Sequence, residues 1–512
     1  MYFFLVKKVF LSSNIRKGGD MAKKERFVKQ LHVSNSVVMM ISILSIAFLL
    51  WTQLKYINSF AATWDQVDFS LALDRYDLMA MQPHFPGYPY FILGGKLVHS
   101  WIENQTAALT VFNILFYFSA LFPMYQLARE YLTRSSSLFM VSLLYSSSYM
   151  LVIVNQPMSE GAAIACLWWY FWSIEKALKE NNRMAKILPL FLFSVLLGIR
   201  LSYLPFAVGL LYLFYKKWAM KKYTMKQIVF HLGVAMLFQF FWVGALIFSE
   251  GSLKGFLKLS LAFTSGHFNS WGNTAVASSI PFSERAKTLV MDNVIWTGVS
   301  SQSLFLFVLY VLLIGLYFYR FRWSILKQNS AEQLAVIMSI SYFFWALFAQ
   351  NIDKPRHILP IAMFLLFLLL LNVLNKFSHS IILILFMMLL IGQSFNSFLL
   401  LKEQATREPA TYQLASYLKK LDEPAVVYAW EETRVLEYLN VPVSYNKVET
   451  YPIFLHDQSY YTNSKILLTD KVLKGFETQE QNLTNRVEKI KEFKSNALFD
   501  PVYDRIILYE WK

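Results

Sequence analysis

The sequence contains very little cysteine and little charge. Of its 512 residues, one is a cysteine, Cys166, and only 16% are charged. A disulfide framework and a cysteine-based metal site each need several cysteines, so both are excluded. The eight histidines show no HExxH-like spacing. The sequence therefore indicates no built-in metal site and predicts no cofactor, and it leaves a divalent metal ion open without indicating one.

Most of the chain also lacks the polar composition of a soluble protein. Hydrophobic residues make up 56% and aromatic residues 17%, and the mean hydropathy is +0.39. A chain this apolar and this long is typical of a membrane protein. The net charge of +15 would suggest a nucleic-acid partner in a soluble chain. Here most Lys and Arg residues lie in short segments between apolar runs, where orientation in the bilayer explains them, so no nucleic-acid partner is predicted.

The amino terminus shows no cleavable signal peptide. Its apolar stretch MYFFLVKKVFL is short, is interrupted by Lys7 and Lys8, and is not followed by a small-residue cleavage site. The choice between Met1 and Met21 as the expected start stays open. In both cases the basic segment 1–36 is expected to stay in the cytoplasm.

Apolar runs long enough to cross the bilayer recur along the chain. About 30 Å of hydrocarbon takes roughly 20 helical residues. Segment 187–215 is too long for one upright helix and contains Gly198, Arg200 and Pro205 near its middle, which predicts two shorter helices meeting at an outward-facing turn. With this segment counted twice, we expect a polytopic α-helical membrane protein of about 11 membrane segments. The other runs lie near 37–54, 107–127, 136–154, 159–178, 228–248, 294–319, 333–350, 357–374 and 380–401.

The distribution of cations predicts the orientation. Segments rich in Lys and Arg alternate with loops that have fewer of them; the rich segments are 1–36, 128–135, 176–186, 216–227 and 320–332. Because cationic loops stay in the cytoplasm, the alternate segments should face outward. These outer segments are 55–106, 249–293, 351–356 and the chain after about residue 402. We therefore expect a multi-pass protein of the cell membrane with its amino terminus inside.

The composition changes after Lys402, which predicts three regions: a basic segment 1–36, a membrane domain 37–401 and an outer domain 402–512. The last region is polar, with short β-branched runs at 425–430, 465–470 and 504–511. The helical pattern TYQLASYLKKL precedes the first run, and EETRVLEYL follows it. Alternation of this kind predicts a small extracytoplasmic α/β domain.

The first outer loop carries the most unusual sequence. If 65–79 forms a helix along the membrane surface, Asp65, Asp68 and Arg75 share one side, and their carboxylates point into water or a cavity. The following QPHFPGYP cannot be regular helix, because each of its prolines lacks an amide donor. A rigid turn is expected there.

These elements resemble a known family. The acidic pair in the first outer loop, followed by the H-x-P-G-Y-P element that contains His84 and Tyr88, resembles the GT-C membrane glycosyltransferases. Within them it is most similar to the relatives of protein O-mannosyltransferases and of the aminoarabinose transferase that modifies lipid A. DKPRHILP at 353–360 resembles the family's R-Y-L-L-P, with His357 replacing Tyr. One departure is that the family often has Asp-Glu where this chain has Asp65-Gln66, with a second acid at Asp68.

The resemblance implies transfer of a sugar from a polyprenyl-phosphate carrier to a glycan, lipid or protein acceptor at the outer face, without a nucleotide-sugar donor. Such a transfer needs a carboxylate to accept the acceptor's proton and cations to stabilise the departing lipid phosphate. Asp65 or Asp68 is the expected base. The expected phosphate-binding and substrate-binding residues are Lys354, Arg356, His357, Arg200, His84, Tyr88 and Glu160.

Structural explanations for several of these residues stay open at this stage. Asp65 and Asp68 are also explained as solvated loop acids, and Arg356 as an anchor at the headgroups. Arg200 is explained equally by snorkelling from its turn. His84, between two prolines, fits a structural hydrogen-bonding role, and Glu160 fits a first-turn acid favoured by the helix dipole.

Other functions also compete. A polytopic transporter or lipid-linked-sugar flippase would share the many spans and the broken 187–215 segment. No repeated halves are evident, however, and acids and cations gather at the outer face rather than at the midplane. A non-catalytic scaffold would tolerate changes at Asp65, Asp68 and Arg356. A metal-dependent oligosaccharyltransferase would need more outer acids than the second outer loop offers.

Overall fold

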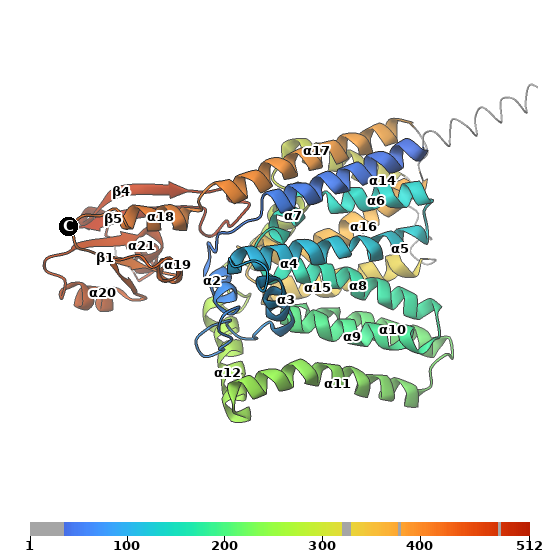
Figure 1. Ribbon diagram of the computed structural model, residues 1–512, viewed down its shortest axis with the longest axis horizontal. Helices are drawn as coiled ribbons and strands as arrows, with labels where there is room; N and C mark the ends of the chain where they lie inside the picture. Colours follow the sequence, from blue (N-terminus) through green and yellow to red (C-terminus); the bar gives the residue numbers. More distant parts are fainter. Residues whose placement is uncertain (1–34, 320–328, 377–379, 480–482) are drawn as a thin grey trace, which may run out of the picture.

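The protein is a bundle of long helices with a small sheet domain at one end (Figure 1). The computed structural model describes residues 35–319, 329–376, 380–479 and 483–512. Nearly all of the predicted basic segment 1–36 and most of 320–332 lie outside these ranges. We call the end of the bundle that faces the sheet domain its domain side.

The predicted apolar runs all fall on helices. The first is the helix Asn35–Lys55. The remaining helices of the bundle and of its connections are α2 Trp64–Leu71, α3 Pro89–His99, α4 Gln105–Ser119, α5 Leu121–Arg129, α6 Arg134–Tyr145, α7 Ser148–Val154, α8 Ser159–Lys179, α9 Arg183–Ile199, η1 Leu201–Phe206, α10 Ala207–Ala219, α11 Met225–Glu250, α12 Leu253–Gly266, η2 His267–Trp271, α13 Phe282–Lys287, η3 Thr288–Val299, α14 Leu304–Tyr319, α15 Ser330–Ala349, η4 Pro355–Ile358, α16 Leu359–Lys376 and α17 Ser380–Thr406.

Fewer of the described helices than expected have the length and composition of a full membrane span. By length and apolar composition, six described helices could cross a membrane, or up to eight if each of two bent pairs counts as one span. The expected number of about 11 is not confirmed. Segment 187–215 explains part of the difference, because it forms α9 and α10, which are 17 and 13 residues long and meet near Arg200. Both are shorter than the roughly 20 residues of a full span.

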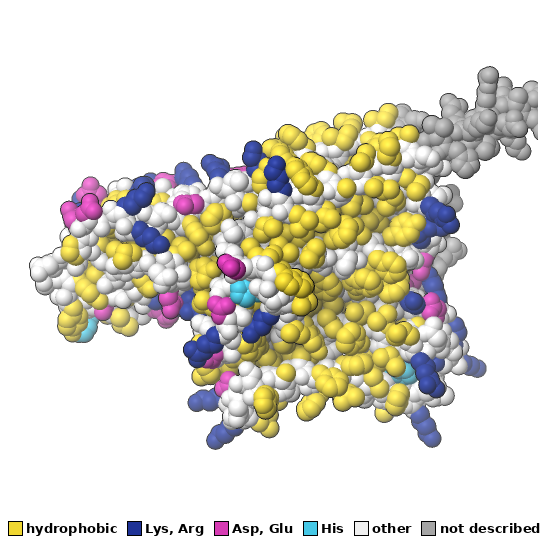
Figure 2. Space-filling view, in the orientation of Figure 1, with side chains coloured by type: hydrophobic (Ala, Val, Ile, Leu, Met, Phe, Trp, Pro, Cys, Tyr) yellow, Lys and Arg dark blue, Asp and Glu magenta, His cyan; other side chains and the backbone are white. Residues whose placement is uncertain are grey.

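The surface of the bundle supports a membrane location. Apolar side chains cover the sides of its helices, whereas charged side chains gather at its two ends and over the sheet domain (Figure 2). On α11, for example, Phe230, Leu237 and Phe248 are exposed. Exposed apolar residues over this length are expected where lipid is the solvent.

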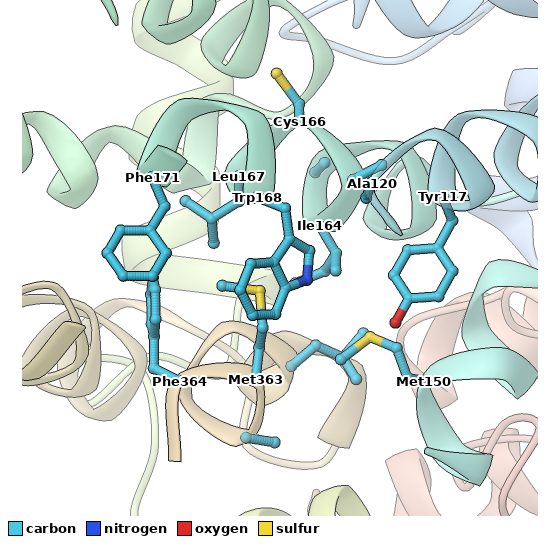
Figure 3. Close-up of a cluster of buried hydrophobic side chains, with 14 of the residues drawn as sticks. Tyr117, Ala120, Met150, Ile164, Cys166, Leu167, Trp168, Phe171, Met363 and Phe364 are labelled. Carbon is cyan, nitrogen blue, oxygen red and sulfur yellow. The ribbon is translucent and has the colours of Figure 1, made fainter. Parts of the chain in front are cut away.

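The interior of the bundle is aromatic and tightly packed. Trp168 of α8 lies beside Met363 of α16, and the neighbouring Phe171 faces Phe364 (Figure 3). The Phe171 and Phe364 ring centroids are 5.5 Å apart in an edge-to-face arrangement. Such packing is characteristic of a rigid core. It joins α8, whose domain-side end carries Glu160, to α16, which directly follows the short helix η4 that carries Arg356.

The first loop departs from the predicted helix 65–79. Helix α2 ends at Leu71, and turns and bends follow it. Arg75 therefore does not share a helix face with the acids but pairs with Asp77 in an exposed position. The turn after it is as expected, since Pro89 then occupies the first position of α3, where its missing amide costs nothing.

The carboxyl-terminal region forms a five-stranded mixed sheet in the order β2-β1-β3-β5-β4. Three strands, β1 Ala425–Ala429, β3 Lys465–Thr469 and β5 Arg505–Trp511, match the predicted runs. Strand β1 is buried along its whole length and pairs in parallel with β2 and β3. The other elements are α18 Ala410–Leu418, α19 Glu432–Tyr438, β2 Ser444–Lys447, α20 Tyr451–Gln458, α21 Asp470–Glu477, η5 Thr484–Arg486 and β4 Val487–Lys494.

Candidate functional site

Two acids and two arginines meet at the domain side of the bundle. Arg356 Nε donates to Glu160 Oε1 over 2.8 Å, and its Nη2 donates to Asp65 Oδ2 over 3.0 Å. Arg200 Nη2 lies 3.2 Å from the same Glu160 oxygen. We call these four residues the charged cluster. They come from four segments that are far apart in the sequence, and all four were singled out by the sequence analysis.

Local structure explains how each residue reaches the cluster. Asp65 and Glu160 lie in the first turns of α2 and α8, where a carboxylate is favoured by the helix dipole. Arg356 follows Pro355, which begins the short helix η4. Arg200 has extended backbone angles between α9 and η1, and its Nη1 donates to Ser159 Oγ over 2.9 Å.

Burial differs within the charged cluster. The side chains of Glu160, Arg356 and Arg200 are at most 9% exposed, whereas that of Asp65 is 31% exposed. Buried charges are stable only when they are paired and hydrogen-bonded, and the two arginines meet this requirement for Glu160 Oε1. Glu160 Oε2 has no hydrogen-bond partner among the described residues. Asp65 is thus the acid of the cluster that a substrate can approach.

The cations around Asp65 control its ionisation. Burial by itself raises the pKa of Asp65, but four nearby positive groups lower it by more, so its pKa lies well below the ordinary value. These groups, in order of effect, are Lys354, His84, Arg356 and Arg200. Asp65 is therefore a carboxylate throughout the neutral range. Lys354 forms no ion pair or side-chain hydrogen bond within the described residues, which leaves its ammonium group available to an anion.

Asp68 lies one helical turn beyond Asp65 but has a different environment. Its side chain is 0% exposed, which is contrary to the expectation that both loop acids point into water or a cavity. Asp68 Oδ2 lies 3.2 Å from His84 Nδ1, and His84 Nε2 lies 3.1 Å from the Tyr88 hydroxyl. Burial raises the pKa of Asp68 above its ordinary value, although His84 and Arg434 oppose this effect.

The H-x-P-G-Y-P element places His84 and Tyr88 against α2. Their rings both contact Phe69, with centroids 5.3 and 4.8 Å away. Gly87 has a φ of +87°, and a Cβ there would come within 2.5 Å of the Tyr76 hydroxyl, which donates to the Gly87 carbonyl. Only glycine fits this turn without strain.

The sequence analysis missed Arg434, which approaches Asp68 from the sheet domain. Arg434 Nε donates to Asp68 Oδ1 over 2.9 Å, so both oxygens of Asp68 are occupied. The two residues are 366 positions apart. Arg434 belongs to the pattern EETRVLEYL, which indicates a helix but nothing about its partner. No local signal in the sequence could have found the contact.

Two further residues have local partners. His357 Nδ1 lies 3.1 Å from the Asn351 carbonyl, and its own carbonyl accepts from the Tyr342 hydroxyl, so His357 joins neighbouring segments and does not enter the charged cluster. The Gln66 amide accepts from the Ala62 backbone N–H and donates to Gln156. Gln66 therefore joins the first loop to Gln156.

Other potential sites lie apart from the charged cluster. Among the described residues, no group of three or more His, Cys, Asp or Glu side chains is placed to hold a metal ion. A small pocket opens between the end of α17, the start of the first loop and the segment between β4 and β5. Gln66 and Gln156 line it, but no member of the charged cluster does.

The bundle, the charged cluster at its domain side and the attached sheet domain define a polytopic membrane protein with the fold of GT-C glycosyltransferases. ArnT from Cupriavidus metallidurans bound to undecaprenyl phosphate shares this fold, with a TM-score of 0.54 and 10% identity over 91% of this chain and 97% of that chain. ArnT from the same organism in the apo state gives a TM-score of 0.51 and 11% identity over the same shares. The resemblance predicted from the sequence is thus confirmed for the fold.

A more distant similarity links the chain to the archaeal oligosaccharyltransferase AglB from Archaeoglobus fulgidus, in complex with an inhibitory peptide and a dolichol-phosphate. The TM-score is 0.42 and the identity 12%, over 83% of this chain and 69% of that chain. No protein-family model and no curated protein matches the chain.

Proposed function

We propose that the protein transfers a sugar from a polyprenyl-phosphate-linked donor to an acceptor at the outer face of the membrane. The observation that carries the proposal is the charged cluster, in which a partly exposed carboxylate lies 3.0 Å from a buried arginine at one end of a GT-C bundle. A structure with this fold, ArnT, contains undecaprenyl phosphate, which supports an anionic lipid as donor carrier.

The residues divide between the two requirements of the reaction. A hydroxyl oxygen of the acceptor attacks the anomeric carbon, its proton passes to Asp65, and the bond from that carbon to the phosphate oxygen breaks with its electron pair on the lipid phosphate. Arg356 and Lys354 are the cations assigned to that phosphate. Arg200 is assigned to holding Glu160, and through it Arg356, because its own guanidinium is already bound to that acid.

The low pKa of Asp65 is consistent with this role. A general base works best when its pKa is near the working pH, and the free site holds Asp65 well below that value. A phosphate bound at Lys354 and Arg356 would offset the two cations that lower this pKa. The proton affinity of Asp65 would then rise once the donor is in place.

The proposal is tested with purified protein, a lipid-linked sugar pool and membrane extract as acceptor, by following release of free lipid phosphate. Wild-type protein should release it, and Asp65→Asn should not. Asp74→Asn is the matched control, because Asp74 belongs to the same loop but is 61% exposed and pairs with His99. Release at the wild-type rate by Asp65→Asn would show that Asp65 is not the base, and no release by the wild-type protein would favour the transporter or flippase function instead.

Action at the outer face is tested separately by cysteine labelling. Cys166 is fully buried, so the background should be low. An impermeant maleimide applied to intact cells should label Lys420→Cys in the sheet domain but not Lys222→Cys, which lies between α10 and α11 at the opposite end; both positions are exposed. Labelling of Lys222→Cys alone would place the charged cluster inside the cell and contradict the outer-face assignment.

A further inference from the structure

We propose that Arg434 of the sheet domain is a positioning residue for the candidate site: it binds the Asp68 carboxylate, and Asp68 in turn holds the ring of His84 beside Asp65. The sheet domain would then be part of the site and not an independent module. The proposal deepens the proposed function and rests on it only where turnover is measured.

The contact belongs to a built interface between the sheet domain and α2. Val435, next to Arg434, packs with Ala61 and Val67, and all three are nearly or fully buried. The Arg434 guanidinium also lies 5.7 Å from the centre of the Trp64 ring. Arg434 itself is 11% exposed, so the charge-assisted bond to Asp68 is shielded from solvent.

Arg434 also contacts the backbone that carries His84. Its Nη2 donates to the Ala80 carbonyl over 3.3 Å, and its Nη1 pairs with Glu437 over 3.0 Å. One guanidinium thus joins α19, α2 and the turn that contains His84. A lysine at this position could keep the positive charge but could not make these three contacts in the same geometry.

The partners of His84 determine which of its nitrogens carries hydrogen. An ionised Asp68 can only accept, so His84 Nδ1 must be the donor across the 3.2 Å contact. The other ring nitrogen, Nε2, then forms the hydrogen bond with the Tyr88 hydroxyl at 3.1 Å. If Asp68 were protonated, the carboxyl could donate to Nδ1 and the hydrogens would rearrange. Keeping Asp68 ionised therefore fixes the state of the His84 ring.

The pair formed by Asp68 and His84 interacts electrostatically with Asp65. Burial lowers the pKa of His84, but Asp68 and Asp65 raise it by more, and Lys354 opposes them. In return, His84 is one of the groups that lower the pKa of Asp65. The charged and titratable groups facing the pair are Asp65 on α2, Tyr88 in the turn, Lys354 before η4, and Arg434 with its partner Glu437 on α19.

The sign of the effect follows from these charges. A cation beside a carboxylate disfavours its protonation, so removal of Arg434 must make the Asp68–His84 pair hold protons more tightly. The acid limb of the activity–pH profile, where Asp68 gains a proton, then moves to higher pH. An opposite charge at this range shifts a pKa by about one unit or more, so we expect a displacement of about one pH unit.

The experiment compares three full-length variants by release of lipid phosphate between pH 5 and 9. Arg434→Met should lose about tenfold or more in turnover near neutral pH and show the displaced limb, because it removes both the charge and the three contacts. Arg434→Lys should return the limb to the wild-type position and recover part of the turnover. Val435→Ala is the matched control, since it weakens the same interface but leaves Arg434 and Asp68 in place.

A purely structural role of α19 predicts that Val435→Ala and Arg434→Met behave alike, and that result would overturn the proposal. The proposal would also be overturned if the acid limb of the activity–pH profile of Arg434→Met lay at the wild-type pH. In an Asp68→Asn background, Arg434→Met should add less than about twofold, because it acts through Asp68. If Arg434→Met does not fold, Arg434→Gln replaces it, since it is also neutral.

A second measurement separates this proposal from the proposed function. With histidine labelled at ¹³Cε1, the His84 signal is identified by its absence in His84→Gln, and its titration is followed by NMR. Its midpoint should rise by about one pH unit in Arg434→Met but not in Val435→Ala. This shift would support the positioning role even if no lipid phosphate were released. An unchanged midpoint would refute it even if transfer were observed.

Discussion

Asp65 and Asp68 lie one turn apart on the same short helix, yet their environments are opposite. Asp65 is partly exposed, borders two arginines and a lysine, and has a lowered pKa, whereas Asp68 is completely buried, has both oxygens occupied and has a raised pKa. A proton acceptor must be reachable, and only Asp65 is. The comparison shows that an acid's role depends on which segments pack around it, even when the local sequence treats two acids alike.

The largest expected effect is that of Asp65→Asn. The amide keeps the shape of the carboxylate but cannot accept a proton, so turnover should fall by roughly 10²–10⁴-fold. Release of lipid phosphate by the purified variant measures the loss. Correct folding is checked by an unchanged melting temperature. A normal rate in both this variant and the Asp65→Asn/Asp68→Asn double variant would show that the loop is not catalytic.

The Arg356 variants should show the next largest effect. Arg356→Ala removes a cation from both Glu160 and Asp65. Because Glu160 keeps Arg200, stability should fall by less than the about 3–5 kcal/mol that an uncompensated buried charge costs. Arg356→Lys should use the lipid-linked donor better than Arg356→Ala, because it retains the charge without the bidentate fork. The apparent KM for the lipid-linked donor distinguishes them.

A triple variant separates stability from donor binding at Arg356. Arg356→Ala leaves Glu160 paired with Arg200 alone, so adding Glu160→Gln and Arg200→Gln removes both remaining buried charges together and should restore most of the melting temperature. Turnover should stay low, because the guanidinium is still missing. Recovery of both properties would mean that Arg356 has only a structural role.

Asp68→Asn should be impaired less than Asp65→Asn. Asparagine can still accept from Arg434 and contact His84, but it carries no charge, so we expect a loss on the order of tenfold. Because position 68 can then no longer gain a proton, the acid limb assigned to Asp68 should disappear from the pH profile. A loss as large as that of Asp65→Asn would reverse the roles assigned to the two acids.

The smallest effect is expected for Gln66→Glu, which restores the family's Asp-Glu pair. Gln66 is buried and donates to Gln156, and a carboxylate cannot replace that donor. Stability should fall by about 1–3 kcal/mol, the cost of an unsatisfied buried group. Turnover per folded molecule should change by less than about threefold. A large gain in turnover would mean that a second acid beside Asp65 is needed.

Local sequence patterns were sufficient for much of the fold. The apolar runs lie on helices, and the broken segment 187–215 forms two helices that meet near Arg200. Three of the five strands were predicted, and they are the ones with β-branched or otherwise apolar runs. Strand β4, with the sequence VEKIKEFK, is charged at the sheet edge, and β2 has only four residues, so neither carries a clear apolar pattern.

The site was predictable to the extent that its members stand out individually. Asp65, Glu160, Arg200 and Arg356 are ionisable residues beside apolar helices, and the structure brings them within hydrogen-bonding distance of one another. The extent of α2 was not predictable from periodicity. Its pattern continues past Leu71, but the chain turns there to bring the following H-x-P-G-Y-P element onto α2.

By itself, the sequence determined the membrane body, the order of its helices and the type of acid at each loop position, because hydrophobic periodicity and residue chemistry are local properties. Only the tertiary structure decided that Asp68 is enclosed and Asp65 is not. Part of that difference comes from Arg434, which is 366 positions away and occupies one of the two Asp68 oxygens. Contacts between such distant segments follow from how whole helices and domains pack, and no window of sequence contains that information.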